Sequence, residues 1–287
     1  MNKFKIKSFC KINLSLNVLK RNNNGYHSIS SLITFCDLHD VLLINKIKGT
    51  KDKVIFTGKF KNNINNKKNT LTNLLNILRK KKILREQAFK INVKKNIPHG
   101  AGLGGGSSNA ASLLNFFIKK MNLKFKKNQV IKIARQIGFD VPIVLKKQNT
   151  FLTGKNEKIK RLKKNFNLNI LIVYPNVVCQ TKKIYRNNKK FSFFKTNFQL
   201  FSKNKKKLMT YLRNQNNDLE QTVIKLHPRV GNLINFIKIQ NGCYFSRITG
   251  SGSACIGIFS KMEEAIYAQK LLNIKFKKYW SVVSKTI

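Results

Sequence analysis

A short stretch of the sequence, Pro98 to Ala111, concentrates glycine and serine in a pattern that suits phosphate binding. Five of the seven residues from 100 to 106 are glycine, and Ser107 and Ser108 follow directly. Glycine adopts left-handed conformations and lets a ligand approach the backbone, so that several N–H groups can converge on one anion. The apolar residues behind the serines predict a helix, which the serines would cap and whose positive end would attract the same anion. The stretch therefore predicts a phosphate-binding loop with hydroxyls available for phosphate or Mg²⁺.

Two familiar phosphate loops do not fit this stretch. Gly100, Gly102 and Gly105 match the dinucleotide pattern, but that motif needs an acidic residue about 20 positions later to hold the ribose. No Asp or Glu occurs between Glu86 and Asp140. A Walker A loop needs Lys directly after its last glycine, and Ser107 stands there. The loop is therefore predicted to be of another kind.

The first half of the chain is predicted to carry the loop on strands and helices. Alternating apolar residues predict a half-buried strand from Phe9 to Leu19, in which Lys11 and Asn13 share one face. Further expected strands are 32–35, 41–44, 54–56 and 89–93. The expected helices are 71–78, 107–117 and 129–137.

The second half is expected to begin near Thr150 and to contain another mixture of elements. The expected strands are 169–174, 243–248 and 254–259. The expected helices are 206–213, 219–225, 228–237 and 263–272. Strands and helices come in blocks without a βαβ rhythm, so the sequence predicts an α+β fold in two lobes. The lobes are expected to cover residues 1–155 and 156–287.

The charge of the chain is extreme: 58 Lys and Arg stand against 10 Asp and Glu, a net charge of +48. One interpretation is a nucleic-acid or anionic-membrane partner. The other is compositional drift, because Lys, Asn, Ile and Phe are the residues of A/T-rich codons and Lys is spread through every segment. Under both interpretations anionic ligands are attracted and their binding is salt-sensitive.

Cysteine and hydropathy patterns favour a reduced, cytoplasmic setting. The five cysteines are scattered and none has C-x-x-C spacing, which does not favour a zinc site. No His, Cys and Asp cluster provides a metal cage. The apolar stretches are too short to span a bilayer, and the N-terminus lacks the apolar core of a secretory signal.

Several motifs together resemble those of the GHMP superfamily of small-molecule kinases, which includes galactokinase, homoserine kinase, mevalonate kinase and phosphomevalonate kinase. Besides the glycine loop, the stretches that carry the resemblance are Lys11–Leu14, Gly25–His27 with Ser31, Asp37–Asp40, Gly138–Pro142, Asn217–Glu220 and Thr249–Cys255. They follow the family's order over nearly the whole chain. Two positions depart from it: Phe139 stands where Ala is usual, and Asn156 where a second Gly is common.

The resemblance implies a fold, an activity and a cofactor. The fold is a two-lobed α+β structure, with an ATP-binding N-terminal lobe similar to ribosomal protein S5 domain 2 and a ferredoxin-like C-terminal lobe. The donor is ATP, with Mg²⁺ arriving on the nucleotide. Within the superfamily the motifs are most similar to the branch that acts on a cytidine-diphosphate-linked acceptor. That implies phosphorylation of the 2-hydroxyl of 4-diphosphocytidyl-2-C-methyl-D-erythritol, in the non-mevalonate route to isoprenoid precursors.

The resemblance also implies residue roles. Asp140 would accept the proton of the attacking hydroxyl, and Lys11 would lie near that hydroxyl and the γ-phosphate. The ATP phosphates would be bound by Pro98, Gly100, Gly102, Leu103, Gly104, Gly105, Gly106, Ser107, Ser108 and Asn109. The acceptor would be bound by Asn13, Tyr26, His27, Tyr185, Thr249 and Gly250, because aromatic rings stack on bases and imidazole can pair with a base edge. Asn69 and Lys95 are expected near the adenine. The turn at 249–253 is expected to brace the glycine loop.

Three alternatives remain open. One is another GHMP kinase, of the homoserine or mevalonate type. A second, from another class, is a basic nucleic-acid-binding protein, although the even spread of Lys does not favour it beyond weak non-specific binding. A third is a non-catalytic relative, against which the presence of both Lys11 and Asp140 argues. The expected assembly is a monomer or a homodimer.

Overall fold

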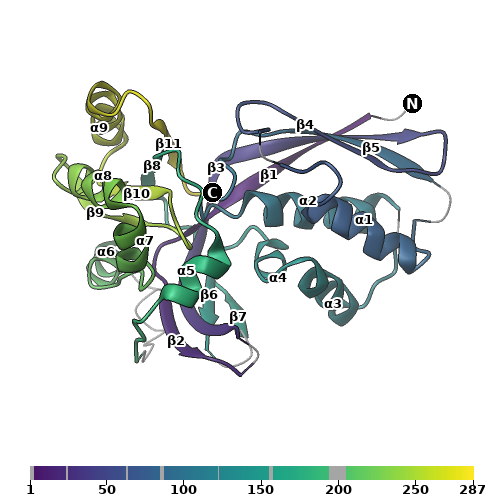
Figure 1. Cartoon of the computed structure of the whole chain (residues 1–287), viewed down its shortest axis with the longest axis horizontal. Coiled ribbons are helices and arrows are strands. Elements are labelled where there is room, and N and C mark those ends of the chain that lie inside the picture. Colours follow the sequence, from purple (N-terminus) through teal and green to yellow (C-terminus); the bar gives the residue numbers. More distant parts are fainter. Residues whose placement is uncertain are drawn as a thin grey trace. The chain divides into compact units, whose positions relative to one another are not determined.

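The computed structural model describes residues 3–23, 25–62, 64–84, 87–121, 123–154, 158–193 and 205–287. Figure 1 shows the course of the chain through its helices and strands. In chain order the elements are β1 (Lys3–Asn13), β2 (Asn17–Arg21), β3 (His27–Ile47), β4 (Lys53–Thr57), α1 (Thr70–Lys80), β5 (Ala88–Lys94), α2 (Gly105–Lys120), α3 (Lys127–Ile137), α4 (Val141–Val144), β6 (Thr150–Thr153), β7 (Lys158–Arg161), β8 (Asn169–Tyr174), α5 (Thr181–Asn187), α6 (Lys205–Arg213), α7 (Glu220–Leu226), α8 (Pro228–Lys238), β9 (Cys243–Ile248), β10 (Cys255–Phe259), α9 (Met262–Lys275) and β11 (Trp280–Lys285).

The chain divides into two compact units that are interleaved in sequence. The first unit comprises Met1–Lys11, Leu38–His99 and Gly104–Lys147; the second comprises Ile12–Asp37, Gly100–Leu103 and Gln148–Ile287. Strands β1 and β3 and the glycine loop therefore each contribute residues to both units. The predicted lobe boundary between residues 155 and 156 lies outside the described residues, and it stays a prediction.

The first unit is a sheet covered by helices. Strand β5 pairs antiparallel with the second half of β3 and parallel with β4. Helices α1 and α2 lie along one face of β4 and β5 (Figure 1), and the rings of Phe89 and Phe117 meet between β5 and α2 with centroids 4.9 Å apart. The four leucines that predict the first helix, at 71, 74, 75 and 78, are all buried on α1. The spacing of apolar residues thus predicts this helix and its buried face correctly.

The second unit contains a four-stranded antiparallel sheet in the order β11-β8-β10-β9. Counted from β8, this order is 4-1-3-2. Helix α8 packs on β9 and β10, and α9 packs on β8 and β11. The chain thus follows the β-α-β-β-α-β scheme of ferredoxin-like folds, with helices α5 to α8 in the first crossover. The predicted ferredoxin-like lobe is confirmed.

The rest of the second unit is built around the first half of β3. Strand β2 pairs with β3 from Asn17 to Arg21, β6 pairs with β3 at residues 31–33, and β7 pairs with β6. The loop after β1 is fixed by an isolated bridge between Leu16 and Asn217. These pairings hold the residues from 12 to 37 against the C-terminal half of the chain.

Two predicted strand boundaries are wrong. The strand expected from Phe9 to Leu19 is interrupted, because β1 ends at Asn13 and β2 begins at Asn17. Conversely, the strands expected at 32–35 and 41–44 form the single strand β3 of 21 residues. That strand contains no Gly or Pro, so nothing in its local chemistry ends it, and its partners change along its length. Among the described residues, no helix is long and apolar enough to cross a bilayer.

Candidate active site

The glycine loop enters its helix without a side-chain cap. Gly104 has φ +67° and precedes α2, which begins at Gly105. The predicted cap by Ser107 and Ser108 is therefore wrong, and both serines lie inside the first turn. The reason is the left-handed conformation of Gly104, which turns the chain into the helix two residues earlier than the polar side chains suggested.

The first turn of α2 offers anion-binding groups. The first intrahelical bond runs from the Ser108 N–H to the Gly104 carbonyl at 2.9 Å, so the amides from 105 to 107 precede it and have no carbonyl acceptor within the helix. The Ser108 hydroxyl is buried and makes no hydrogen bond within the described part of the chain. Free amides, a positive helix end and a buried hydroxyl together suit a phosphate oxygen.

Lys11 and Asp140, which lie 129 residues apart in sequence, come together in the first unit. The Lys11 Nζ is 3.4 Å from Asp140 Oδ2. The Lys11 side chain is 6% exposed, whereas that of Asp140, directly before α4, is 41% exposed. The pair thus combines a buried cation with a carboxylate that a ligand can reach. Their predicted proximity is confirmed.

The same lysine lies against the start of the phosphate loop's helix. A methyl group at Gly104 would stand 2.6 Å from Cγ of Lys11 and 2.9 Å from its Cε. The absence of a side chain at 104 therefore makes room for the Lys11 stem. The loop and the Lys11–Asp140 pair form one cluster, as phosphoryl transfer requires of a phosphate site and its catalytic groups.

A buried carboxylate that sequence reasoning left without a role holds this cluster together. Asp40 of β3 is fully buried and pairs with the Lys95 ammonium. It also accepts hydrogen bonds from the amides of Asn96 and Ile97 at 2.8 and 2.9 Å and from Asn109 Nδ2 at 3.1 Å. Asp40 thus ties β3 to the segment before the loop and to α2. The sequence places Asp40 between the strands expected at 32–35 and 41–44, close to the polar Asp37 and His39, so only the structure puts it inside a strand.

Lys95 and Asn69, the two residues expected near the adenine, have structural partners. Lys95 is buried on Asp40, and Asn69 caps α1 by accepting hydrogen bonds from the amides of Leu71 and Thr72. Their approach to adenine stays a prediction. The neighbouring Thr70 donates to the Gly106 carbonyl at 2.8 Å, which places the start of α1 beside the first turn of α2.

In the second unit, the turn from 249 to 253 packs against the other part of the loop. The Ala254 N–H donates to the Ala101 carbonyl at 3.1 Å, and a methyl group at Gly102 would lie only 2.1 Å from the Thr249 carbonyl oxygen. Thr249 Oγ1 also accepts a bond from the Asn13 N–H at 2.8 Å. The turn therefore braces residues 100–103, as expected.

The polar groups of Asn13 and Gly250 take part in the same scaffold. Asn13 Nδ2 donates to Ser31 Oγ at 2.8 Å, and the Gly250 carbonyl accepts from Asn217 Nδ2 at 2.9 Å. Asn13 is buried. The structure thus shows how these residues are held, while their contact with an acceptor stays a prediction.

Aromatic residues expected to bind a base also meet in the second unit. The rings of His27 and Tyr185 have centroids 5.2 Å apart, and Phe191, which sequence reasoning missed, lies 6.4 Å from His27. Tyr26 is half exposed. Burial, and then the charge of Arg21, lower the pKa of His27, which keeps the ring neutral near pH 7. A neutral imidazole can both donate and accept a hydrogen bond.

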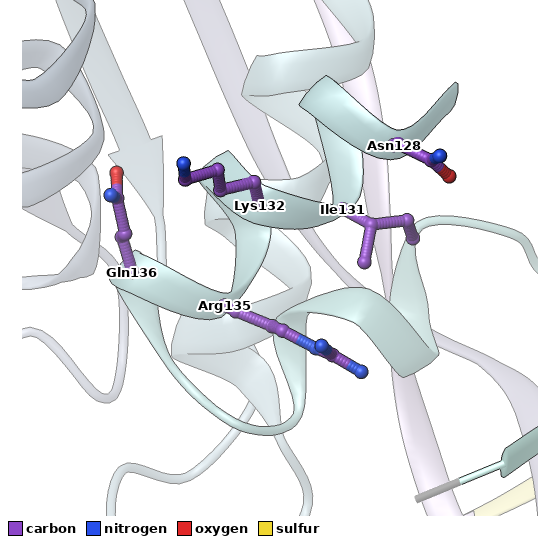
Figure 2. Close-up of a pocket in the computed structure, with 5 residues that line it drawn as sticks. All are labelled: Asn128, Ile131, Lys132, Arg135 and Gln136. Atoms are coloured by element: carbon purple, nitrogen blue, oxygen red, sulfur yellow. The ribbon is translucent and has the colours of Figure 1, made fainter. Parts of the chain in front are cut away.

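A surface hollow elsewhere in the first unit does not belong to this site. Figure 2 shows the residues that line it, which all project from α3: Asn128, Ile131, Lys132, Arg135 and Gln136. None of them is a predicted site residue. Its lining includes two cationic side chains, those of Lys132 and Arg135, but neither a carboxylate nor a residue of the glycine loop. Within the described ranges, no three His, Cys, Asp or Glu side chains gather as a metal cage would need.

Comparison with known proteins gives the class. The model of the GHMP kinase N-terminal domain matches residues 69–148, and that of the GHMP kinase C-terminal domain matches residues 199–278. The two matches cover more than half of the chain and include the glycine loop, Asp140 and the turn at 249. The chain belongs to the GHMP kinases, and it is therefore an ATP-dependent kinase of a small molecule.

The chain is also similar to individual kinases of this class. The chain is 42% identical to the 4-diphosphocytidyl-2-C-methyl-D-erythritol kinase of Pelagibacter ubique (strain HTCC1062), over the whole length of both proteins. It resembles the crystal structure of a 4-(cytidine 5'-diphospho)-2C-methyl-D-erythritol kinase with a TM-score of 0.77 and 23% identity, covering 98% of this chain and 99% of that one. Homoserine kinase from Cytophaga hutchinsonii ATCC 33406 follows with a TM-score of 0.74 and 17% identity, covering 100% and 95%. At these identities the structures establish the fold and leave the acceptor open.

Proposed function

We propose that this kinase transfers the γ-phosphoryl group of ATP to the 2-hydroxyl of 4-diphosphocytidyl-2-C-methyl-D-erythritol. The observation that carries the chemistry is the 3.4 Å contact between Lys11 Nζ and Asp140 Oδ2, with the Lys11 stem against Gly104 at the start of α2. The acceptor is supported by the 42% identical relative that bears the corresponding name.

The phosphates of ATP bind at the glycine loop. Amides in the first turn of α2 donate to phosphate oxygens, and the positive helix end favours their charge. The Lys11 ammonium, held at the same end of α2, neutralises charge on the γ-phosphate as it is transferred. Such preorganised positive groups supply most of what phosphoryl transfer needs from a protein.

Mg²⁺ fits this arrangement as a partner of the nucleotide. The buried hydroxyl of Ser108, which has no hydrogen bond within the described residues, is the protein group suited to it. Mg²⁺ normally keeps several waters and binds through substrate phosphates with few protein ligands, and it supplies further charge neutralisation there.

The acceptor hydroxyl is activated by Asp140. Its oxygen forms the new bond to Pγ, the bond between Pγ and the β,γ-bridging oxygen breaks, and ADP leaves. The hydroxyl proton passes to the Asp140 carboxylate, which is exposed enough to reach it. Lys11 stabilises the charge on the attacking oxygen, so the two residues act as a unit.

The cytosine of the acceptor binds at the aromatic residues of the second unit. Tyr26 and Tyr185 offer faces for stacking, and the neutral His27 offers hydrogen bonds to the base edge. Homoserine and mevalonate have no base, so these rings favour a cytidine-linked acceptor over both.

The test is ADP release by the purified chain with ATP, Mg²⁺ and each of three acceptors. We expect turnover with the cytidine-linked acceptor and at least about 100-fold lower kcat/KM with homoserine or mevalonate. Asp140→Asn should lower kcat by roughly 10²-fold or more, the usual contribution of a general base, with little change in the KM for ATP. A preference for homoserine or mevalonate would overturn the proposed acceptor, and equal rates for Asp140→Asn would remove Asp140 from the mechanism.

A further inference from the structure

The ring of Phe191 lies nearly parallel to that of His27. Their planes differ by 16° and their centroids are 6.4 Å apart, whereas Tyr185 is tilted by 37° at 5.2 Å. Stacked aromatic contacts have centroid separations of about 4.5–7 Å. Two rings therefore lie beside one imidazole, and only that of Tyr185 was expected from sequence.

Phe191 also retains a large accessible face. It is 45% exposed although its ring lies nearly parallel to that of His27. An apolar face of this size gains free energy when a planar ligand covers it. The residue is thus placed to contact a base that pairs with His27.

Strand β2 fixes the position of Phe191 through the backbone of Val18. The Val18 carbonyl accepts a hydrogen bond from the Ser192 N–H at 2.8 Å, and the Val18 N–H donates to Asp218 Oδ2 at 2.8 Å. Because Phe191 directly precedes Ser192, this bond holds the backbone of Phe191 close to β2. Since β2 also pairs Arg21 with His27, one strand positions both rings.

A second connection joins the same segment to Asp218. Lys190 Nζ is 3.3 Å from Asp218 Oδ1, and the carboxylate is fully buried. Asn188 strengthens the turn by donating to the Lys190 carbonyl at 2.6 Å. Asp218 belongs to a sequence motif to which the proposed chemistry assigns no role, and its contacts converge on the residues beside Phe191.

We infer that Phe191 is a specificity-determining residue for the pyrimidine base of the acceptor, and that Asp218 positions it through Val18 and Lys190. This inference rests on the proposed function. Phe191 and His27 bind the base, and the Asp218–Lys190 pair holds the segment that carries Phe191. The loop at α2 is the proposed site of the donor phosphates, and Phe191 has no role in it, so the expected effect is on the acceptor alone.

The first experiment compares Phe191→Ala with wild type in steady-state kinetics and in calorimetric binding of CDP. We expect the acceptor KM and the Kd for CDP to rise at least about fivefold, equivalent to the ~1 kcal/mol lower end of base stacking. The KM for ATP should stay within about twofold. Phe191→Tyr, which keeps the ring, should retain nearly wild-type values.

Phe193→Ala is the matched control, because Phe193 lies in the same segment and is fully exposed. It should leave every constant unchanged. If Phe191→Ala melts at the wild-type temperature and keeps both the acceptor KM and the CDP affinity, the inference is overturned while the proposed function stands. If wild type itself fails to phosphorylate the cytidine-linked acceptor, the proposed function falls and the inference falls with it.

The positioning role is tested with Lys190→Met against Lys189→Met. Both lysines are exposed and both substitutions remove one positive charge, but of the two only Lys190 pairs with Asp218. Lys190→Met should raise the acceptor KM about two- to fivefold, with kcat and the KM for ATP unchanged, and Lys189→Met should not. An equal effect of both variants would identify a general charge effect and overturn the role of Asp218.

Discussion

At the scale of residues, the site depends on a few side chains whose surroundings set their chemistry. Lys11 is buried beside an accessible Asp140, and His27 is partly buried beside Arg21. In the proposed mechanism, the first arrangement places a cation where the charge of the transferred phosphate would gather. The second keeps an imidazole neutral, as the proposed recognition of a base edge requires.

The His27 environment predicts a pH dependence that is confined to the acceptor. Because its pKa lies below the ordinary value of about 6.5, His27 is neutral at pH 7 to 8 and gains a proton only as the pH falls below 6.5. Protonation removes its acceptor nitrogen, so the acceptor KM should be constant above pH 6.5 and rise below it.

The measurement is a pH series of both KM values for wild type and His27→Gln. The KM for ATP should not share the acid rise, and the variant should lack it. The pKa of His27 is lower in the folded state than in the unfolded chain, so the unfolded chain binds this proton more readily. The free energy of unfolding should therefore decrease as the pH falls below 6.5. An acceptor KM that rises toward alkaline pH instead would contradict the assignment.

At the scale of elements, the loop and α2 are positioned by close backbone contacts and by one buried carboxylate. Gly104 leaves room for Lys11, and Gly102 leaves room for the Thr249 carbonyl. Asp40 connects β3, the segment after β5, and α2. The phosphate site thus depends on residues that need not touch the phosphate.

Gly104→Ala should lower kcat by at least about tenfold and reduce stability. The new methyl group would stand 2.6 Å from Lys11 Cγ, and the left-handed backbone adds roughly 1–2 kcal/mol of strain. Gly49→Ala is the control, since Gly49 also has positive φ (+105°) but nothing lies within 4 Å of the added methyl group. If both variants lose only stability and keep full activity, Gly104 does not position Lys11.

Asp40→Asn should destabilise the fold by about 3–5 kcal/mol, because it leaves the Lys95 ammonium buried without its counter-ion. Thermal or urea unfolding measures the change. The double variant Asp40→Asn/Lys95→Met should regain part of the loss, since it removes the unpaired charge. Asp52→Asn, which breaks the more accessible pair with Arg79, should cost less. A double variant no more stable than Asp40→Asn would show that the ion pair is not the cause.

At the scale of the whole molecule, only 10 Asp and Glu are present among 58 Lys and Arg. The aspartates at positions 40, 52, 140 and 218 form ion pairs. Each of these stabilises a loop, anchors a strand or belongs to the candidate site. The net charge of +48 surrounds these positions with a field that attracts anions.

The field predicts that salt weakens substrate capture. Raising the ionic strength from about 0.05 to about 0.3 M shortens the Debye length to well below 10 Å, so the KM for ATP and that for the anionic acceptor should both rise several-fold, while kcat changes little. Initial rates at each salt concentration, with melting temperatures in the same buffers as the control, measure the effect. KM values independent of salt would show that the excess Lys and Arg act too far from the site to matter.

Sequence patterns were sufficient where a signal is local. Leucine spacing specified α1, and the order of the motifs specified the kinase family. Five glycines in seven residues predict an anion loop, and the structure places a left-handed Gly104 at the start of α2. The sequence patterns failed in two places. The start of α2 depends on the left-handed backbone of Gly104, which a glycine permits but does not require. The interruption between β1 and β2 depends on a non-local contact, the pairing of Leu16 with Asn217.

The sequence by itself determined the residue types that the chemistry needs: a glycine loop, one lysine, one aspartate and aromatic rings for a base. Only the tertiary structure decided that Asp40 holds the loop and that Phe191 joins His27. Local spacing encodes the period of helices and strands, whereas a contact between residues over a hundred positions apart exists only once the sheets and helices have packed.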